Sequence, residues 1–387
     1  MSQPDPVVDP AAPPPPPRKA SSWALLRAFV LGGLGGGLGA LALIHGLRAI
    51  GGSIPAPPSF GPGHMLALLG WLVLAVVVHE LGHLVGGRMA GMRPLMIAAG
   101  PVRLTRTVAG WRLSRHSLRH GLLGFVSMLP DMSRPFVPQL RWLAAGGPLA
   151  SLACVALSAA LAASLDGAMR FHALAFMAVS ALVLAMTAIP MRAGGIETDG
   201  AQLLDLARGG RGTQIKALVM GLTAQSLAGT RPRELDPRLL ADAMALAASD
   251  TPINPAMRAF PSLMAALHAD DSGDTPARDR HMAHVAVLAT EMQPAMRAQF
   301  ALELAWHAAM RGDVAAARGW REHAAGGVAD TCDRQRIDAA IAVLEGDVEG
   351  ARRSIHLARA GLQRSWDAGG ARWAGDQLDR LEQKLPR

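Results

Sequence analysis

Three residues near position 80 have the types and the spacing of a metal-dependent hydrolase site. His79 and His83 are four positions apart, and Glu80 lies between them in the sequence HELGH. On a helix, positions i and i+4 share one face, so both imidazoles can reach one Zn²⁺ while Glu80 points at the open coordination position. Zinc lowers the pKa of its bound water toward neutrality, and a nearby carboxylate can take the proton. The spacing therefore predicts a catalytic zinc site, one Zn²⁺ per chain, with Glu80 as the general base.

The motif lies within an apolar run from Met65 to Gly91, which is long enough to cross a bilayer. Ionisable side chains are costly in such a segment and mark functional sites. Hydrophobic residues make up 50% of the chain, and its mean hydropathy is positive. These features indicate a membrane protein with an intramembrane metal site.

The charge divides the chain into two parts. Residues 1–199 contain 15 Lys and Arg against 7 Asp and Glu, whereas residues 200–387 contain 23 of each, so the excess of +8 lies in the first part. We expect a proline-rich disordered tail at 1–22, a membrane-embedded domain at 23–206 and a cytoplasmic α-helical domain at 207–387. With only Cys154 and Cys332, a structural disulfide is not expected. We expect no nucleic-acid partner.

Four apolar segments predict four membrane spans. They run from about Trp23 to Leu47, from Met65 to Gly91, from Trp142 to Leu165 and from Phe171 to Pro190. Residues 88–141, around the loop between the second and third spans, contain nine arginines, whereas the other two loops carry one arginine each. The positive-inside rule therefore places both termini in the cytoplasm of a multi-pass cell-membrane protein, with the metal nearer the cytoplasmic face.

The arginine-rich loop has the alternation of β-strands. VRLTRTV and WRLSRHSL flank an Ala109-Gly110 turn, which predicts a hairpin, and GLLGFVSML at 121–129 predicts a further strand. A sheet edge beside the site could hold an extended peptide by strand addition. The alternative is a basic loop that lies on anionic lipid headgroups.

A catalytic zinc needs a third protein ligand. Most acidic residues of the membrane part lie in the tail, in the basic loop or on the opposite side of the bilayer, which leaves Glu197 and Asp199 after the last span. Asp199 is favoured because Gly200 follows it and would let a backbone pack close to the metal. Glu197 remains the alternative.

Three sequence motifs together resemble the site-2 protease family of intramembrane zinc metalloproteases. They are HELGH at 79–83, GGPLAS at 146–151 and the pair Asp199-Gly200, and the resemblance covers about residues 65–206. It implies that His79, His83 and Asp199 bind zinc and that Glu80 is the general base. Ser151 stands where the family often has an asparagine that supports the substrate or the transition state. GFVSML is similar to the family's membrane-associated strand.

The C-terminal part contains a repeat. RGDVAAARGWREHA from Arg311 and EGDVEGARRSIHLA from Glu345 are offset by 34 residues, the period of tetratricopeptide helix pairs, and a degenerate copy begins near Ser272. The alternative is a plain antiparallel helical bundle. Either arrangement would bind a protein partner or shield the site.

We therefore expect a mainly α fold, with about four membrane helices, a small membrane-associated β element and a soluble all-α repeat-like domain. The expected function is that of an intramembrane zinc metalloprotease, a zinc metalloendopeptidase that cuts membrane proteins in or near their transmembrane segments. The alternative is a catalytically silent membrane scaffold that presents a cytoplasmic partner-binding domain. A scaffold, however, has no need of a base between two metal ligands.

Overall fold

The computed structural model describes residues 62–115, 124–193, 196–248, 254–292, 294–324 and 331–386. The predicted proline-rich tail and the first predicted span lie outside these residues. In the described part the chain is mainly helical and carries a small antiparallel sheet, which confirms the predicted fold class at this level.

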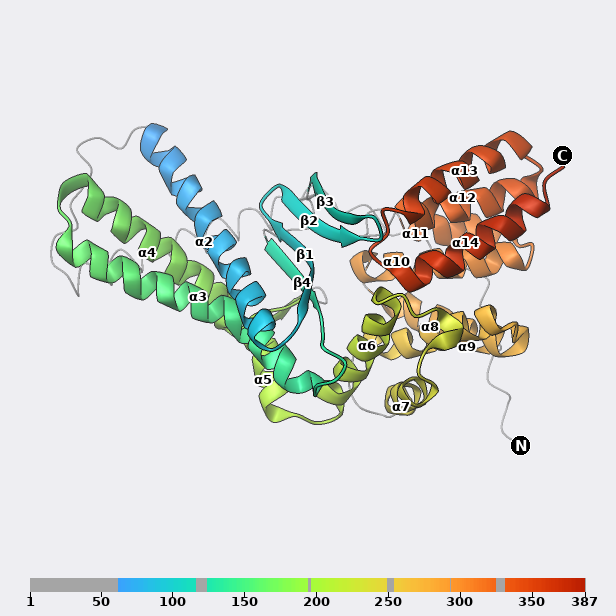
Figure 1. Cartoon of the computed structure of the whole chain (residues 1–387), viewed down its shortest axis with the longest axis horizontal. Coiled ribbons are helices and arrows are strands. Elements are labelled where there is room, and N and C mark those ends of the chain that lie inside the picture. The colour runs from blue at the N-terminus through green and yellow to red at the C-terminus, as the bar shows by residue number, and fades with distance from the viewer. Residues whose placement is uncertain are drawn as a thin grey trace.

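Three helices of the described part are long and apolar enough to cross a membrane: α2 (Pro62–Met89), α3 (Phe136–Ser164) and α4 (Gly167–Ala188). They lie together at one end of the molecule (Figure 1). They correspond to the second, third and fourth predicted spans, although α3 begins at Phe136, before the predicted start. Most of their large apolar side chains face outward, as expected for surfaces that contact lipid.

Glycines let α2 and α3 approach closely. A Cβ added at Gly82 would lie 2.4 Å from the carbonyl oxygen of Gly146, and one added at Gly146 would lie 2.2 Å from the carbonyl oxygen of Gly82. One turn further along, a Cβ at Gly86 would lie 2.2 Å from the carbonyl oxygen of Trp142. Small residues at a four-residue spacing allow such backbone contact between membrane helices. This crossing brings GGPLAS against the turn that carries HELGH.

A four-stranded antiparallel sheet lies between the membrane helices and the C-terminal helices (Figure 1). Its strands are β1 (Arg93–Ala99), β2 (Val102–Thr107), β3 (Gly110–Arg115) and β4 (Gly124–Leu129), in the order β3-β2-β1-β4. The predicted hairpin is β2-β3, in which Thr107 pairs with Gly110, and the predicted strand GFVSML is β4. Strand β1 was not predicted; it pairs with both β2 and β4 and carries a register shift between Pro94 and Met96.

Short elements connect the membrane helices to the C-terminal part. After α4 come the two-residue strands β5 (Arg192–Ala193) and β6 (Ile196–Glu197), then the helices α5 (Asp199–Arg208) and α6 (Arg211–Leu227). A 3₁₀ turn, η2 (Pro232–Glu234), and helix α7 (Pro237–Ala247) follow.

The C-terminal part contains three consecutive helical hairpins. They are α8 (Pro255–Ser272) with α9 (Thr275–Glu291), α10 (Pro294–Met310) with α11 (Val314–His323), and α12 (Thr331–Glu345) with α13 (Val348–Leu362). The last helix, α14 (Ala368–Gln383), packs on α13 and α6.

The three hairpins turn in the same way. Each turn has a glycine at positive φ, between 75° and 82°, followed by an aspartate whose carboxylate caps the next helix. The glycines are Gly273, Gly312 and Gly346. A left-handed glycine and an Asp cap are the usual end and start signals of helices. The predicted copies near Ser272, Arg311 and Glu345 fall at these turns, so the 34-residue offset corresponds to a repeated helical hairpin.

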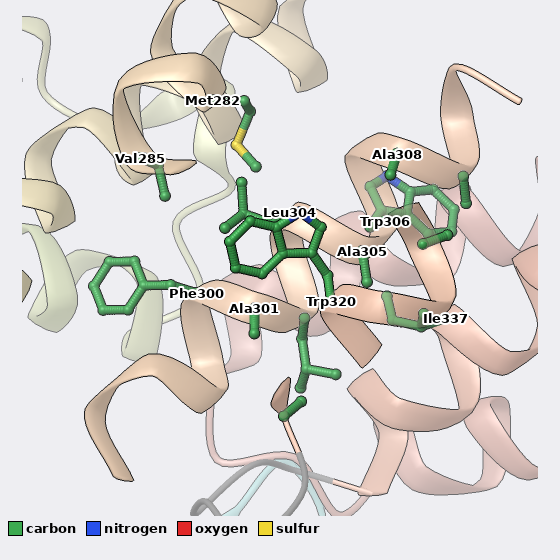
Figure 2. Close-up of a cluster of buried hydrophobic side chains, with 14 of the residues drawn as sticks. Met282, Val285, Phe300, Ala301, Leu304, Ala305, Trp306, Ala308, Trp320 and Ile337 are labelled. Atoms are coloured by element: carbon green, nitrogen blue, oxygen red, sulfur yellow. The ribbon is translucent and has the colours of Figure 1, made fainter. Parts of the chain in front are cut away.

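The hairpins share one hydrophobic core. Figure 2 shows part of it, including Met282 and Val285 of α9, Phe300 and Leu304 of α10 and Trp320 of α11. Trp320 is 1% exposed. A core of this size, formed without α2, α3 or α4, agrees with a C-terminal part that folds around its own apolar residues.

Candidate metal centre

Three potential ligand atoms, two from α2 and one from the start of α5, lie close together. The Nε2 atom of His79 lies 3.1 Å from Oδ2 of Asp199, the Nε2 atom of His83 lies 3.4 Å from the same oxygen, and the two Nε2 atoms are 3.2 Å apart. In a tetrahedral site with bonds of about 2.0–2.1 Å, ligand atoms are separated by about 3.3 Å. The three distances therefore fit three corners of a zinc tetrahedron and leave the fourth corner for water or substrate.

The outer nitrogens of both rings are held by other groups. His83 Nδ1 lies 2.7 Å from the carbonyl oxygen of Leu143, which can only accept, and 3.3 Å from the backbone nitrogen of Gly147, which can only donate. The shorter contact favours His83 as the donor to Leu143. His79 Nδ1 lies 2.9 Å from the hydroxyl oxygen of Ser151. When both rings are protonated at Nδ1 only, the two Nε2 lone pairs and a carboxylate oxygen face one point, an arrangement that a bound cation would stabilise. When a ring is protonated at Nε2, it donates to Asp199 instead.

Asp199 is positioned by the start of α5. Thr198 caps the helix and also donates to the carbonyl oxygen of Ile189 at 2.8 Å, which joins α5 to the end of α4. A Cβ at Gly200 would lie 1.8 Å from the carbonyl oxygen of Ala188. Gly200 therefore permits close packing on α4, and not against the metal ligands as the sequence had suggested. Arg141 of α3 donates to the carbonyl oxygen of Leu206 at 2.6 Å and holds the other end of α5.

The Asp199 carboxyl has a pKa below its usual range. Burial raises this pKa, but hydrogen bonds and charge interactions with His79 and His83 more than offset the effect. Asp199 is therefore ionised at neutral pH, as a metal ligand must be.

The alternative ligand Glu197 lies elsewhere. Its carboxylate is 2.5 Å from Lys216 Nζ and 3.4 Å from Arg192 Nε, and Asp205 also contacts both cations. Among the described residues, the group of metal-ligating side chains that lie close together is His79, His83 and Asp199, and Glu197 does not belong to it.

Two glycines that the sequence did not single out as site residues bring backbone close to the functional side chains. A Cβ at Gly147 would lie 2.4 Å from His83 Nε2 and 2.7 Å from His79 Nε2. A Cβ at Gly124 would lie 2.2 Å from Oε1 of Glu80. Gly147 stands in the quoted GGPLAS motif, whereas Gly124 opens β4 and carries no local signal of its contact with α2.

Glu80 is buried on the same turn of α2 as the two histidines and lies against β4. In the four-stranded sheet β4 pairs with β1 on one side and is an edge strand. The predicted general base therefore lies between the ligand cluster and a sheet edge, where a peptide in extended form could reach both.

Comparison of the chain with protein-family models, with curated proteins and with solved structures gives no match in any of the three.

Proposed function

We propose that the chain is an intramembrane zinc metalloprotease of the site-2 protease kind, which hydrolyses peptide bonds in or near transmembrane segments of membrane proteins. The observation that supports this most strongly is the convergence of His79, His83 and Asp199 beside Glu80, on helices apolar enough to span a membrane. The alternative, a catalytically silent membrane scaffold, needs neither three converging ligands nor a base next to them.

His79, His83 and Asp199 would hold the zinc ion, which when bound supplies Lewis acidity for polarising a carbonyl and acidifying water. Ser151 and the Leu143 carbonyl fix the orientation of the two imidazoles. Glu80 takes a proton from the attacking water and returns it to the leaving amine. Since Glu80 is buried and the cluster is almost closed to solvent, this proton transfer takes place away from bulk water.

The edge of β4 would hold the substrate. A transmembrane helix hides its carbonyls in internal hydrogen bonds, so the substrate must unwind before it is cut. Backbone hydrogen bonds to β4 would replace those that unwinding removes, and they would not depend on the side chains of the substrate. Gly124 keeps β4 close enough to Glu80 for the scissile bond to meet the base.

The topology is part of the proposal. With the first predicted span included, four spans place both termini in the cytoplasm, and the turn between α3 and α4 lies outside. A cysteine at Ala168 in the first turn of α4, next to that turn, and one at Arg353 on α13, both exposed positions, should react with an impermeant thiol reagent from opposite sides of the membrane. The background would carry Cys154→Ala and Cys332→Ala. Labelling from the same side would contradict the four-span arrangement.

The helical hairpins support a partner-binding role for the C-terminal domain, of the kind that tetratricopeptide repeats perform. Stacked helix pairs present extended concave surfaces. This role accompanies the protease and does not replace it.

The test is zinc content and cleavage of a transmembrane substrate by the purified protein. Glu80→Gln should retain zinc and lose cleavage, because it removes the base and no ligand. His79→Ala, His83→Ala and Asp199→Ala should lose both. Glu197→Ala is the matched control, two positions from Asp199, and should retain zinc. Full cleavage by Glu80→Gln would refute the protease and favour the silent scaffold.

A further inference from the structure

The C-terminal domain contains an acidic cavity of about 240 Å³. It lies among α6, α8, α10, α12 and α14 and the turn between α13 and α14. Three carboxylates line it: Glu303 of α10, Asp333 of α12 and Asp367, the cap of α14. Glu303 is paired with Arg336, and Asp367 accepts hydrogen bonds from Ser226 and Gly370. The described lining residues include no lysine, arginine or histidine, so the carboxylates outnumber the cation that pairs with Glu303 and the cavity favours a further cationic group.

The rest of the lining is largely apolar and aromatic. Trp366, Trp373, Phe260 and Pro232 form much of the wall. Behind it, Arg336 lies 4.9 Å from the ring centres of both Trp306 and Trp373. Indole rings attract guanidinium groups in this way. A ligand with both apolar surface and a positive charge would match such a wall.

Two polar atoms of the lining residues have no hydrogen-bond partner in the described part of the chain. Glu303 pairs with Arg336 through Oε1, whereas its Oε2 is buried and unpaired. The indole N–H of Trp373, a residue that is 3% exposed, is also unpaired. Buried groups of this kind usually have partners. Burial raises the pKa of the Glu303 carboxyl and Arg336 only partly offsets it, so a second cation would stabilise the charged form.

The volume indicates the size of the occupant. Small-molecule sites usually have about 300–1,000 Å³, so this cavity suits one or two side chains of a peptide. Proline-rich segments bind aromatic-lined surfaces because their extended helix is already formed. A basic residue beside the prolines would meet the carboxylates.

The chain itself carries such a segment. Residues 13–19 read PPPPPRK; they lie outside the described residues, and only their sequence enters here. In the four-span arrangement this segment and the C-terminal domain are on the same side of the membrane. A tethered segment binds at an effective concentration that a free peptide rarely reaches.

We propose that the cavity is the docking site of the chain's own segment Pro13–Lys19, with a basic side chain at Glu303 and Asp333 and prolines against Trp366. The proposal goes beyond proteolysis and does not depend on it; it uses only the four-span topology. The turn that carries Trp366 also carries Ser365, which accepts a hydrogen bond from the β2-β3 hairpin. A docked tail would therefore lie next to the contact between the sheet and the C-terminal domain.

The test uses the full chain in detergent, with a recognition site for a sequence-specific protease inserted between Ser21 and Ser22. Cutting after purification removes the tail without altering membrane insertion. A fluorescent peptide of residues 10–21 should bind the cut protein at least ten-fold more tightly than the uncut protein, whose own tail competes. The same peptide with Arg18→Ala and Lys19→Ala should bind at least ten-fold more weakly.

Cavity variants locate the binding. Asp333→Asn and Trp366→Ala should each weaken peptide binding to the cut protein at least five-fold. Asp338→Asn, on the same helix but paired with Arg321 outside the cavity, and Trp111→Ala on the hairpin should not. If circular dichroism shows that Trp366→Ala is unstable, the test rests on Asp333→Asn, which keeps the shape of the side chain and removes its charge.

Three results would overturn the proposal. The first is a cut protein that does not bind the peptide, and the second is binding that neither cavity variant weakens. The third is equal binding by cut and uncut protein, which would assign the cavity to a basic peptide of another chain.

Discussion

The Nδ1 atom of His79 lies 2.9 Å from the hydroxyl oxygen of Ser151, and both groups are buried. The resemblance to site-2 proteases had suggested a substrate-supporting role for Ser151. From this position Ser151 can also hold the His79 ring with Nε2 toward Asp199. Whether Ser151 also supports substrate stays a prediction.

Ser151→Ala should weaken zinc binding by about 10- to 100-fold, the usual effect of removing a hydrogen bond that orients a ligand. The measurement is zinc affinity in competition with a chelator of known strength. Ser158→Ala is the matched control, because Ser158 is a buried serine of the same helix and belongs to no part of the ligand cluster. Equal zinc affinities for the two variants would exclude the orienting role.

Gly124→Ala should reduce cleavage and leave zinc bound. The added Cβ would lie 2.2 Å from Oε1 and 2.6 Å from Cγ and Cδ of Glu80, so the base or strand β4 must move. A displacement of about 1 Å at a reacting group can reduce the rate by about 100-fold. Turnover and zinc stoichiometry should be measured on the same preparation.

The control for Gly124→Ala is Gly70→Ala, in the same apolar helix as Glu80, since a Cβ there meets nothing within 4 Å. It should have the activity of the parent protein. Unchanged cleavage by Gly124→Ala would mean that β4 does not position Glu80.

The sequence predicted those features that depend on interactions between residues close together in the chain. The i, i+4 spacing in HELGH follows from helix geometry alone, and the alternation in VRLTRTV identifies β2 without knowledge of its partners. The 34-residue offset predicted a helical repeat, and the structure shows that the hairpin turns share a left-handed glycine and an Asp cap, both of which act within a few residues.

Contacts between distant segments were not predictable in the same way. The sequence RPLMIAA lacks alternation, and the burial of β1 does not alternate either, because a register shift lies between Pro94 and Met96; the segment therefore gave no strand signal. Asp199 was favoured over Glu197 because Gly200 follows it. In the structure the two residues differ in their contacts, because the carboxylate of Glu197 pairs with Arg192 and Lys216 and not with the histidines. The close approaches of Gly124 and Gly147 exist only once α2, β4 and α3 are packed.

A further contact joins the sheet to the C-terminal domain. The amide of Val108 at the tip of the β2-β3 hairpin donates to the carbonyl oxygen of Ser365 at 3.0 Å, and the amide of Ala109 donates to that of Gln363 at 3.2 Å. Val108→Pro removes the first donor. Thr107 before it is an extended strand residue, which a following proline tolerates.

Val108→Pro should increase amide hydrogen exchange at the β2-β3 hairpin and at the α13-α14 turn by about five-fold, which corresponds to the loss of about 1 kcal/mol for one hydrogen bond. Val108→Ala keeps the amide and is the control. Hydrogen–deuterium exchange followed by mass spectrometry reports both segments in one experiment. Exchange that is equal in the two variants would show that the contact does not hold the sheet to the domain.

A buried ion pair connects η2 to α8. Arg231 donates to Asp271 at 2.7 Å and 3.3 Å, and the backbone N–H of Arg233 donates to the same carboxylate at 3.1 Å. The Asp271 side chain is 1% exposed. Burial raises the pKa of Asp271, but these hydrogen bonds more than offset it, so the pKa lies below its usual range.

Because the folded-state pKa of Asp271 is lower than the unfolded value of about 3.9, its contribution is present above that pH and is lost as the pH falls through the folded-state pKa. Asp271→Asn should therefore lower the melting temperature at pH 7 and reduce the part of the acid destabilisation that begins below about pH 5. Thermal unfolding followed by tryptophan fluorescence at several pH values is the measurement. Asp338→Asn, whose partly exposed pair with Arg321 contributes about 1 kcal/mol at most, is the control. A pH profile for Asp271→Asn parallel to that of the parent protein would assign the acid sensitivity to other carboxylates.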